Sequence, residues 1–171
     1  MKKRKLFLPL FVVAIMISST IGFMGGESYD SEHYGDYTFT KVNTGWVTYI
    51  EGKQYLFDYL PGDLEDMDYD LGHIDLTNLY IAYTPSELND DMNYAISKLR
   101  NFLAYRGEFS QIACLGEENC PDIPVVSCES DNVIGFINGE EKIYKVDKCT
   151  YVSGDFIKSV NRICYDILGV M

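Results

Sequence analysis

Five cysteines in the second half of this 171-residue chain constrain its fold more than any other feature, because paired cysteines tie distant segments together. They are Cys114, Cys120, Cys128, Cys149 and Cys164. No two of them have the Cys-x-x-Cys spacing, so neither a zinc ribbon nor a thioredoxin-like redox motif is supported. Whether they form disulfides depends on the compartment, which the N-terminus indicates.

The N-terminus has the three parts of an export signal. Four basic residues at 2–5 precede the apolar stretch 6–17 and a segment of small residues at 18–20. The uncharged run reaches Gly26, which is long enough to span hydrocarbon, where about 20 residues are needed. We predict a signal peptide or signal-anchor helix at 1–26. An uncleaved segment would hold the protein to the membrane, with the rest of the chain outside.

In an exported chain, cysteines are more often disulfide partners than metal ligands. Asn138-Gly139 is typical of a two-residue hairpin turn, which sets the register of its two strands. In that register Cys128 lies opposite Cys149, at a position where the Cα atoms are close enough for a disulfide. We therefore predict a bridge between these two residues.

The remaining cysteines are assigned by proximity. Cys114 and Cys120 are the nearest pair along the chain, and we predict that they form the second bridge. Cys164 follows Ile163 on the inner side of a predicted helix, so we predict a free and buried thiol. A redox-active thiol is the alternative, and no neighbouring basic residue or second cysteine at redox spacing supports it.

A β-hairpin is predicted in the first half of the chain. Aromatic and β-branched residues lie on both sides of a glycine-containing turn at 51–52. In this register Trp46 faces Phe57 and Thr48 faces Tyr55, so the ribbon has one face that another layer can cover.

Two amphipathic helices are predicted. Thr84, Pro85 and Glu87 have the residue types of a helix start, and apolar residues then recur every three or four positions until Gly107 ends the helix. The second helix is predicted at about 155–168.

Further strands are predicted at 79–83, 109–114 and 125–128. Together these elements predict an α+β fold, with one mainly antiparallel β-sheet and two amphipathic helices packed on one face. We expect a single extracytoplasmic domain at 37–171, preceded by an acidic linker at 27–36.

The charge balance bears on the partners. The chain has 14 Lys and Arg against 26 Asp and Glu, for a net charge of −12, and four of the basic residues lie in the predicted leader. Such an acidic body argues against nucleic acid as a partner, because phosphate binding needs a basic surface. We expect the partner to be another envelope protein or a cell-surface component.

An acidic loop raises the question of calcium. Asp66, Asp68 and Asp70 match positions one, three and five of an EF-hand loop, but the glycine comes one place late and position twelve is Thr77 instead of Glu. An EF-hand is therefore excluded. A looser calcium site is the alternative to a solvated acidic loop, which we prefer, and we predict no tight metal site here.

No catalytic motif is recognisable. The two histidines, His33 and His73, lie in predicted linker and loop segments, and neither a Gly-x-Ser-x-Gly nor a His-Glu-x-x-His sequence is present.

Several stretches in the second half of the chain, 124–128, 133–134, 143–144, 149–152 and 162–171, resemble small exported proteins of archaea. The resemblance implies an exported compartment and no particular activity. We predict an envelope-associated protein that is most simply a binding or structural interaction module. The competing prediction is an extracytoplasmic hydrolase with a carboxylate-based site.

Overall fold

The structure is a computed structural model that describes residues 30–70, 74–129 and 131–171. Ser31–Met171 forms one compact unit, which contains the helices and strands described below. The predicted leader at 1–26 lies outside the described residues. Within the described ranges, no helix is long and apolar enough to cross a membrane.

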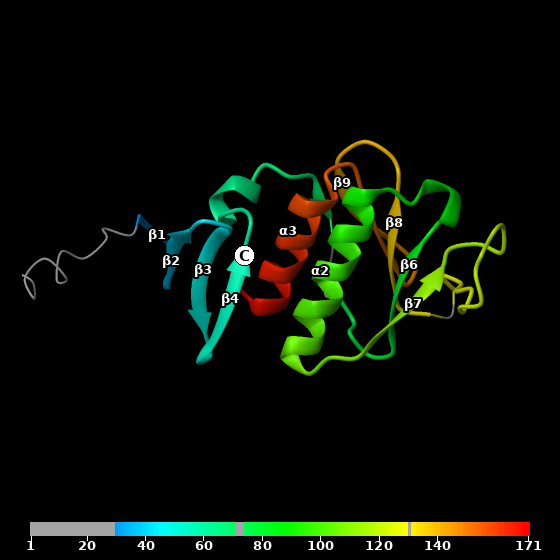
Figure 1. The fold of residues 1–171 in the computed structure, drawn as a ribbon, viewed down its shortest axis with the longest axis horizontal. Coiled ribbons are helices and arrows are strands. Elements are labelled where there is room, and N and C mark those ends of the chain that lie inside the picture. Colours follow the sequence, from blue (N-terminus) through cyan, green and yellow to red (C-terminus); the bar gives the residue numbers. More distant parts are fainter. Residues whose placement is uncertain (1–29, 71–73, 130) are drawn as a thin grey trace, which may run out of the picture. The chain divides into compact units, whose positions relative to one another are not determined.

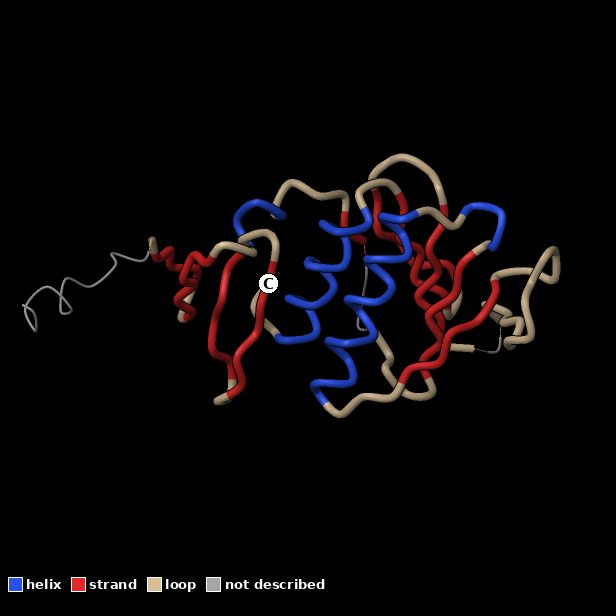
Figure 2. The backbone as a smooth tube through the Cα atoms, in the orientation of Figure 1, coloured by secondary structure: helices blue, strands red, loops and turns tan. Residues whose placement is uncertain are grey.

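Residues 31–171 form three layers, with two helices between two sheets (Figure 1). Figure 2 shows the helices in blue between two groups of red strands. One cluster of buried side chains runs through all three layers, from Phe39 and Phe57 on one sheet, through the helices, to Ile81 and Phe136 on the other. The prediction of an α+β fold is thus confirmed in its class but not in its arrangement.

The first sheet is built from consecutive antiparallel strands in the order β1 (Ser31–Tyr34), β2 (Tyr37–Val42), β3 (Gly45–Ile50) and β4 (Lys53–Phe57). The predicted β3–β4 register is confirmed, since Trp46 pairs with Phe57 and Thr48 with Tyr55. Strand β1 lies within the segment 27–36 that was predicted to be a linker, and it pairs with β2 along its whole length. That part of the linker prediction is wrong, because polar residues at 31–34 have the hydrogen-bonding edge of β2 to pair with.

The second sheet is mostly parallel, which corrects the predicted antiparallel arrangement. Its strand order is β5-β9-β10-β8-β6-β7, and among the described residues only β9 and β10 pair antiparallel. The strands are β5 (Tyr69–Asp70), β6 (Leu79–Tyr83), β7 (Ser110–Cys114), β8 (Val133–Ile137), β9 (Lys142–Val146) and β10 (Cys149–Ser153).

The connection between β6 and β7 explains the parallel pairing, because a helix joins these two strands. Two strands on either side of a helix are the elements of a βαβ unit, in which the strands run parallel. Strand β8 is buried almost throughout, as is typical of a parallel strand that is covered on both faces.

The hairpin predicted at Asn138-Gly139 is wrong, because β10 lies between β8 and β9. The N–H of Asn138 donates to the Glu87 carboxylate, 2.8 Å away, and not to a facing strand. The connection then passes close to the end of β10, where a Cβ on Gly154 would lie 2.4 Å from the Cα atom of Glu141. The tight turn is instead at Asp147, with φ 53°, between β9 and β10.

Both disulfides nevertheless join the cysteines that the sequence analysis pairs. Cys114 is bonded to Cys120 and Cys128 to Cys149, with Cα–Cα distances of 6.0 and 5.0 Å, and Cys164 is free and buried. The Cys128–Cys149 pair forms for a different reason from the one predicted. Strands β8 and β10 run parallel and begin side by side, and just before them the N–H of Lys148 donates to the carbonyl of Cys128, 3.1 Å away.

The two helices are α2 (Asp90–Arg106) and α3 (Phe156–Leu168). The predicted start at Thr84 gives only a short 3-10 helix, η3 (Pro85–Glu87), and α2 begins later because the Asn89 side chain accepts a hydrogen bond from the N–H of Met92. The predicted end at Gly107 is confirmed, as are the bounds of α3, where Asp155 provides the N-terminal cap. A second 3-10 helix, η2 (Pro61–Leu64), follows the first sheet.

The outer faces of the two sheets differ. On the second sheet Ala113, Ala82 and Gly135 lie side by side on neighbouring strands. Because their side chains are small or absent, Leu115 packs closely on the sheet there. Residues of the loop that follows β7, among them Val126 and the bridged Cys128, also pack on this face. The outer face of the first sheet has exposed side chains instead.

Candidate functional site

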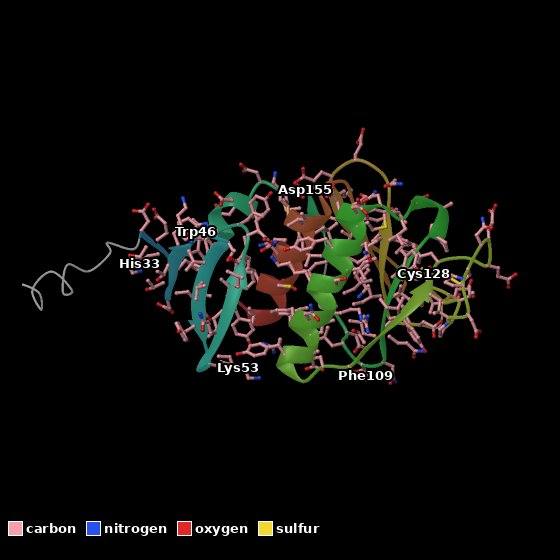
Figure 3. All side chains as sticks on the ribbon, in the orientation of Figure 1. His33, Trp46, Lys53, Phe109, Cys128 and Asp155 are labelled. Atoms are coloured by element: carbon pink, nitrogen blue, oxygen red, sulfur yellow. A yellow bond between two sulfur atoms is a disulfide. The ribbon has the colours of Figure 1, made fainter. Side chains whose placement is uncertain are left out.

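A groove of about 530 Å³ runs between strand β4 and helix α2, and we call it the β4–α2 groove. A pocket of this size is within the range of ligand sites in proteins. One wall is β4 with Asp58, and the other is one side of α2. Lys53, at the start of β4, marks one end and is labelled in Figure 3.

The helix side of the groove follows from the period of α2. Its groove-lining residues recur at three- and four-residue spacing and are Tyr94, Ser97, Lys98, Asn101, Phe102 and Tyr105. Next to this row lies the fully packed row that holds α2 against the core, and it contains Met92, Ala95, Ile96, Leu99 and Leu103. The groove row is therefore a second stripe, which the core leaves uncovered.

A polar bridge joins three elements at one end of the groove. Lys98 on α2 forms an ion pair with Asp58, and the two side chains are 18% and 27% exposed. The amide of Asn161, which is fully buried on α3, donates to Asp58 at 2.9 Å. Its oxygen also accepts from the backbone N–H of Asp58 at 3.0 Å. Asp58 is thus held in one position by two helices.

Aromatic side chains line the rest of the groove. The ring of Tyr55 lies 5.8 Å from that of Phe102 and 5.5 Å from that of Tyr105. Phe57 stacks on Tyr165 of α3, with ring centroids 4.0 Å apart. These contacts hold the groove walls in place, because each ring is packed on its neighbour.

The free cysteine lies at the base of the groove. Cys164 is 2% exposed, and burial raises the pKa of its thiol, with a smaller opposing effect of Lys98. A thiol with a raised pKa holds its proton and is a weak nucleophile. This arrangement agrees with the structural role predicted for Cys164.

Strand β4 is an edge strand, and part of its backbone is open to the groove. The turn at 51–52 makes Ile50 and Lys53 a hydrogen-bonded pair, so the backbone groups of Gln54 and Leu56 point away from β3. The N–H of Asp58, two positions on, confirms this direction because it bonds to α3. Within the described residues, no hydrogen bond reaches the backbone of Gln54 or Leu56 from another element.

The charges at the two ends of the groove differ. Lys53 contacts Tyr105 near the last turn of α2, which also contains Arg106. The first turn of α2, beyond Tyr94, contains Asp90 and Asp91. The groove therefore has a basic end and an acidic end.

The residues of the acidic loop, for which calcium binding was the alternative to a solvated loop, do not line the groove. Asp66 is exposed in a turn after η2, and Asp68 forms an ion pair with Lys142 at 3.0 Å. Asp70 is in β5, and the position of its side chain is outside the description. Among the described residues, no three acidic, histidine or cysteine side chains are grouped as a metal site would need.

The two histidines are not brought together with these groups. His33 lies on β1, where its ring bonds to Thr38 at 3.1 Å, and His73 is outside the described residues. The carboxylate that lines the groove is Asp58, which the sequence analysis did not single out. Its partners Lys98 and Asn161 are 40 and 103 positions away, so no local pattern could have revealed the bridge.

The comparisons with known proteins found no matching family model, no matching curated protein and no matching solved structure. The proposals below therefore rest on the residues and geometry of this chain.

Proposed function

We propose that this protein is an interaction module of the cell envelope that binds its partner in the β4–α2 groove. The observation that carries the proposal is the groove itself, where an unpaired strand edge lies beside a half-exposed row of aromatic residues on α2. Tyr94 and Tyr105 are each 52% exposed there. Aromatic residues of this kind are typical of binding surfaces, since they add a large contact area and lose little conformational freedom.

The compartment supports the same proposal. The two disulfides indicate an oxidising, extracytoplasmic environment. Within that environment we propose attachment to the membrane through 6–26, or release after cleavage of the leader. Protease digestion of intact cells and N-terminal sequencing of the mature protein distinguish these two states, and digestion only after lysis would contradict export.

The binding proposal is tested with two variants of the same helix turn. Asn101 lies in the groove, whereas Ala104 is exposed outside it. Asn101→Arg places a long side chain in the groove, and Ala104→Arg adds the same side chain to a surface that does not line the groove. We expect a partner captured from envelope extract by the wild type to be retained by Ala104→Arg and reduced at least tenfold by Asn101→Arg.

The measurement is quantitative mass spectrometry of proteins cross-linked to the disulfide-intact protein. Equal capture by all three proteins, or no enrichment over an unrelated acidic protein, would overturn the proposal. The competing hydrolase prediction has one groove carboxylate to consider, Asp58, and that group is already bonded to Lys98 and Asn161.

A further inference from the structure

We infer that the β4–α2 groove binds an extended polypeptide segment, which adds to β4 as a fifth strand of the first sheet. This inference rests on the proposed function and names the class of partner. Its first support is the edge backbone at Gln54 and Leu56, whose N–H and C=O groups supply four hydrogen-bonding positions. Strand addition to such an edge is a common way for domains to bind peptides.

The length of the groove agrees with a short strand. On the helix side it extends from Tyr94 to Tyr105, which is about 16 Å at about 1.5 Å per residue. On the strand side it extends from Gln54 to Asp58, which is about 13 Å at about 3.3 Å per residue. Both values fit an extended segment of about five residues.

The open edge has a defined end. At Asp58 the next outward N–H is already bonded to Asn161, so a bound segment pairs with Gln54 and Leu56 but not beyond. Every second side chain of the segment then faces α2, where Tyr94, Phe102 and Tyr105 lie. The preferred segment has apolar or aromatic side chains at alternate positions.

Charge sets the direction of the segment. A strand that runs antiparallel to β4 begins near the acidic end of the groove, by Asp90 and Asp91, and ends near Lys53. A basic residue is therefore favoured at its N-terminal side and a carboxylate at its C-terminal side. The net charge of −12 also favours a segment with basic flanks, because it attracts cations at long range.

The test uses a phage-displayed library of linear peptides, selected on the disulfide-intact protein. We expect enriched sequences with alternating apolar residues and a basic residue on the N-terminal side. In two-dimensional NMR spectra the selected peptide should slow hydrogen exchange at the amides of Gln54 and Leu56. The amides of Tyr55 and Phe57, which already face β3, should be protected before the peptide is added.

Two variants of one residue separate the backbone from the side chain. Leu56→Pro removes the outward N–H, at an edge position where proline is tolerated, and should weaken peptide binding at least tenfold. Leu56→Ala keeps that N–H and should change binding less than threefold. The circular dichroism spectrum of each variant shows whether it has folded, and Asn101→Arg gives a third weakened variant that does not alter β4.

The outcomes distinguish the two proposals. Selected peptides that leave Gln54 and Leu56 exchanging freely, or no enrichment over a control protein, overturn strand addition. When strand addition is overturned in this way, the capture experiment decides the proposed function. If Asn101→Arg captures less of the envelope partner than the wild type does, the groove binds another class of ligand and the proposed function stands. If Asn101→Arg captures as much as the wild type, both proposals fail.

Discussion

The two sheets cover the same pair of helices from opposite sides, yet they are built in different ways. The first sheet joins β1 to β4 through short turns, in chain order, and contains no cysteine. The second sheet places β10 between β8 and β9, joins β6 to β7 through α2, and contains one cysteine of each disulfide, Cys114 in β7 and Cys149 in β10. Local pairing therefore suffices on one side of the helices, whereas the other depends on contacts between distant segments.

Core substitutions on the two sheets test this difference with the largest expected effect. Phe57 and Phe136 are both buried and both face the helices. Either change to alanine should lower the free energy of unfolding by about 3–5 kcal/mol, measured by urea denaturation. We expect Phe57→Ala to increase hydrogen exchange first in β1–β4, where no disulfide limits the opening.

Phe136→Ala should instead increase exchange in both sheets, because β8 is central in the second sheet. The same exchange pattern for both variants would show that the sheets open as one unit.

The disulfides give the next largest effect. Cys128→Ser with Cys149→Ser opens a bridge with a sequence separation of 21 and should cost about 3 kcal/mol in the chain-entropy model. Cys114→Ser with Cys120→Ser opens one with a separation of 6 and should cost about 2 kcal/mol. Melting temperatures of the two double variants, compared without reductant, check the order, and a reversed order would contradict it.

Alkaline pH should weaken the contact between α3 and its neighbours. Burial raises the pKa of Tyr165 and of the Cys164 thiol above the ordinary values of 10.0 and 9.0. The folded state then binds these protons more tightly than the unfolded state. The stabilisation that comes from these raised pKa values is fully present below the ordinary values, and it is lost as the pH rises above them.

We expect the free energy of unfolding to decrease from about pH 9 to pH 11, and to decrease less steeply in Cys164→Ala. Denaturation curves at each pH measure it. A constant free energy up to pH 11 would contradict the assignment of these groups as protonated and buried.

The Cys164 thiol should also be unreactive toward alkylating reagents in the folded protein. Its thiol should react with iodoacetamide only after denaturation, and non-reducing peptide mapping should recover it unpaired. Rapid alkylation of the folded protein would show that the groove opens to its base.

The smallest effects are expected in the acidic loop. Asp68 and Lys142 form an exposed ion pair, so Asp68→Asn should change stability by less than about 1 kcal/mol. Millimolar calcium should leave the melting temperature unchanged relative to magnesium. A rise with calcium that is lost in Asp68→Asn would reveal a metal site.

The same contrast explains how far the sequence predicts the structure. The β3–β4 hairpin follows from residues a few positions apart, so Trp46 is correctly placed opposite Phe57. The order of the second sheet does not, because β10 meets β8 through a parallel pairing that no turn motif specifies. The strand–helix–strand series at 79–114 is the local signal for the parallel pairing of β6 and β7, which the antiparallel prediction did not include.

The groove was less predictable than the fold. Tyr94, Phe102 and Tyr105 have helical spacing, but only the position of β4 shows that they line an opening. In the sequence Asp58 is not distinguished from the other carboxylates of an acidic chain. Its position in the groove depends on its bonds to Lys98 of α2 and Asn161 of α3.

The late arrival of α3 has a consequence for biosynthesis. The chain leaves the ribosome N-terminus first, so the strands of the first sheet emerge early and can pair by themselves. Helix α2 emerges next and covers Tyr55, but Phe39 and Phe57 meet the ring of Tyr165 only when α3 has been made. The hydroxyl of Tyr165 then donates to the Tyr59 carbonyl across 106 positions. For all of that interval the nascent sheet presents Phe39 and Phe57 to its surroundings, which makes it a target for chaperones and, when synthesis stalls, for aggregation.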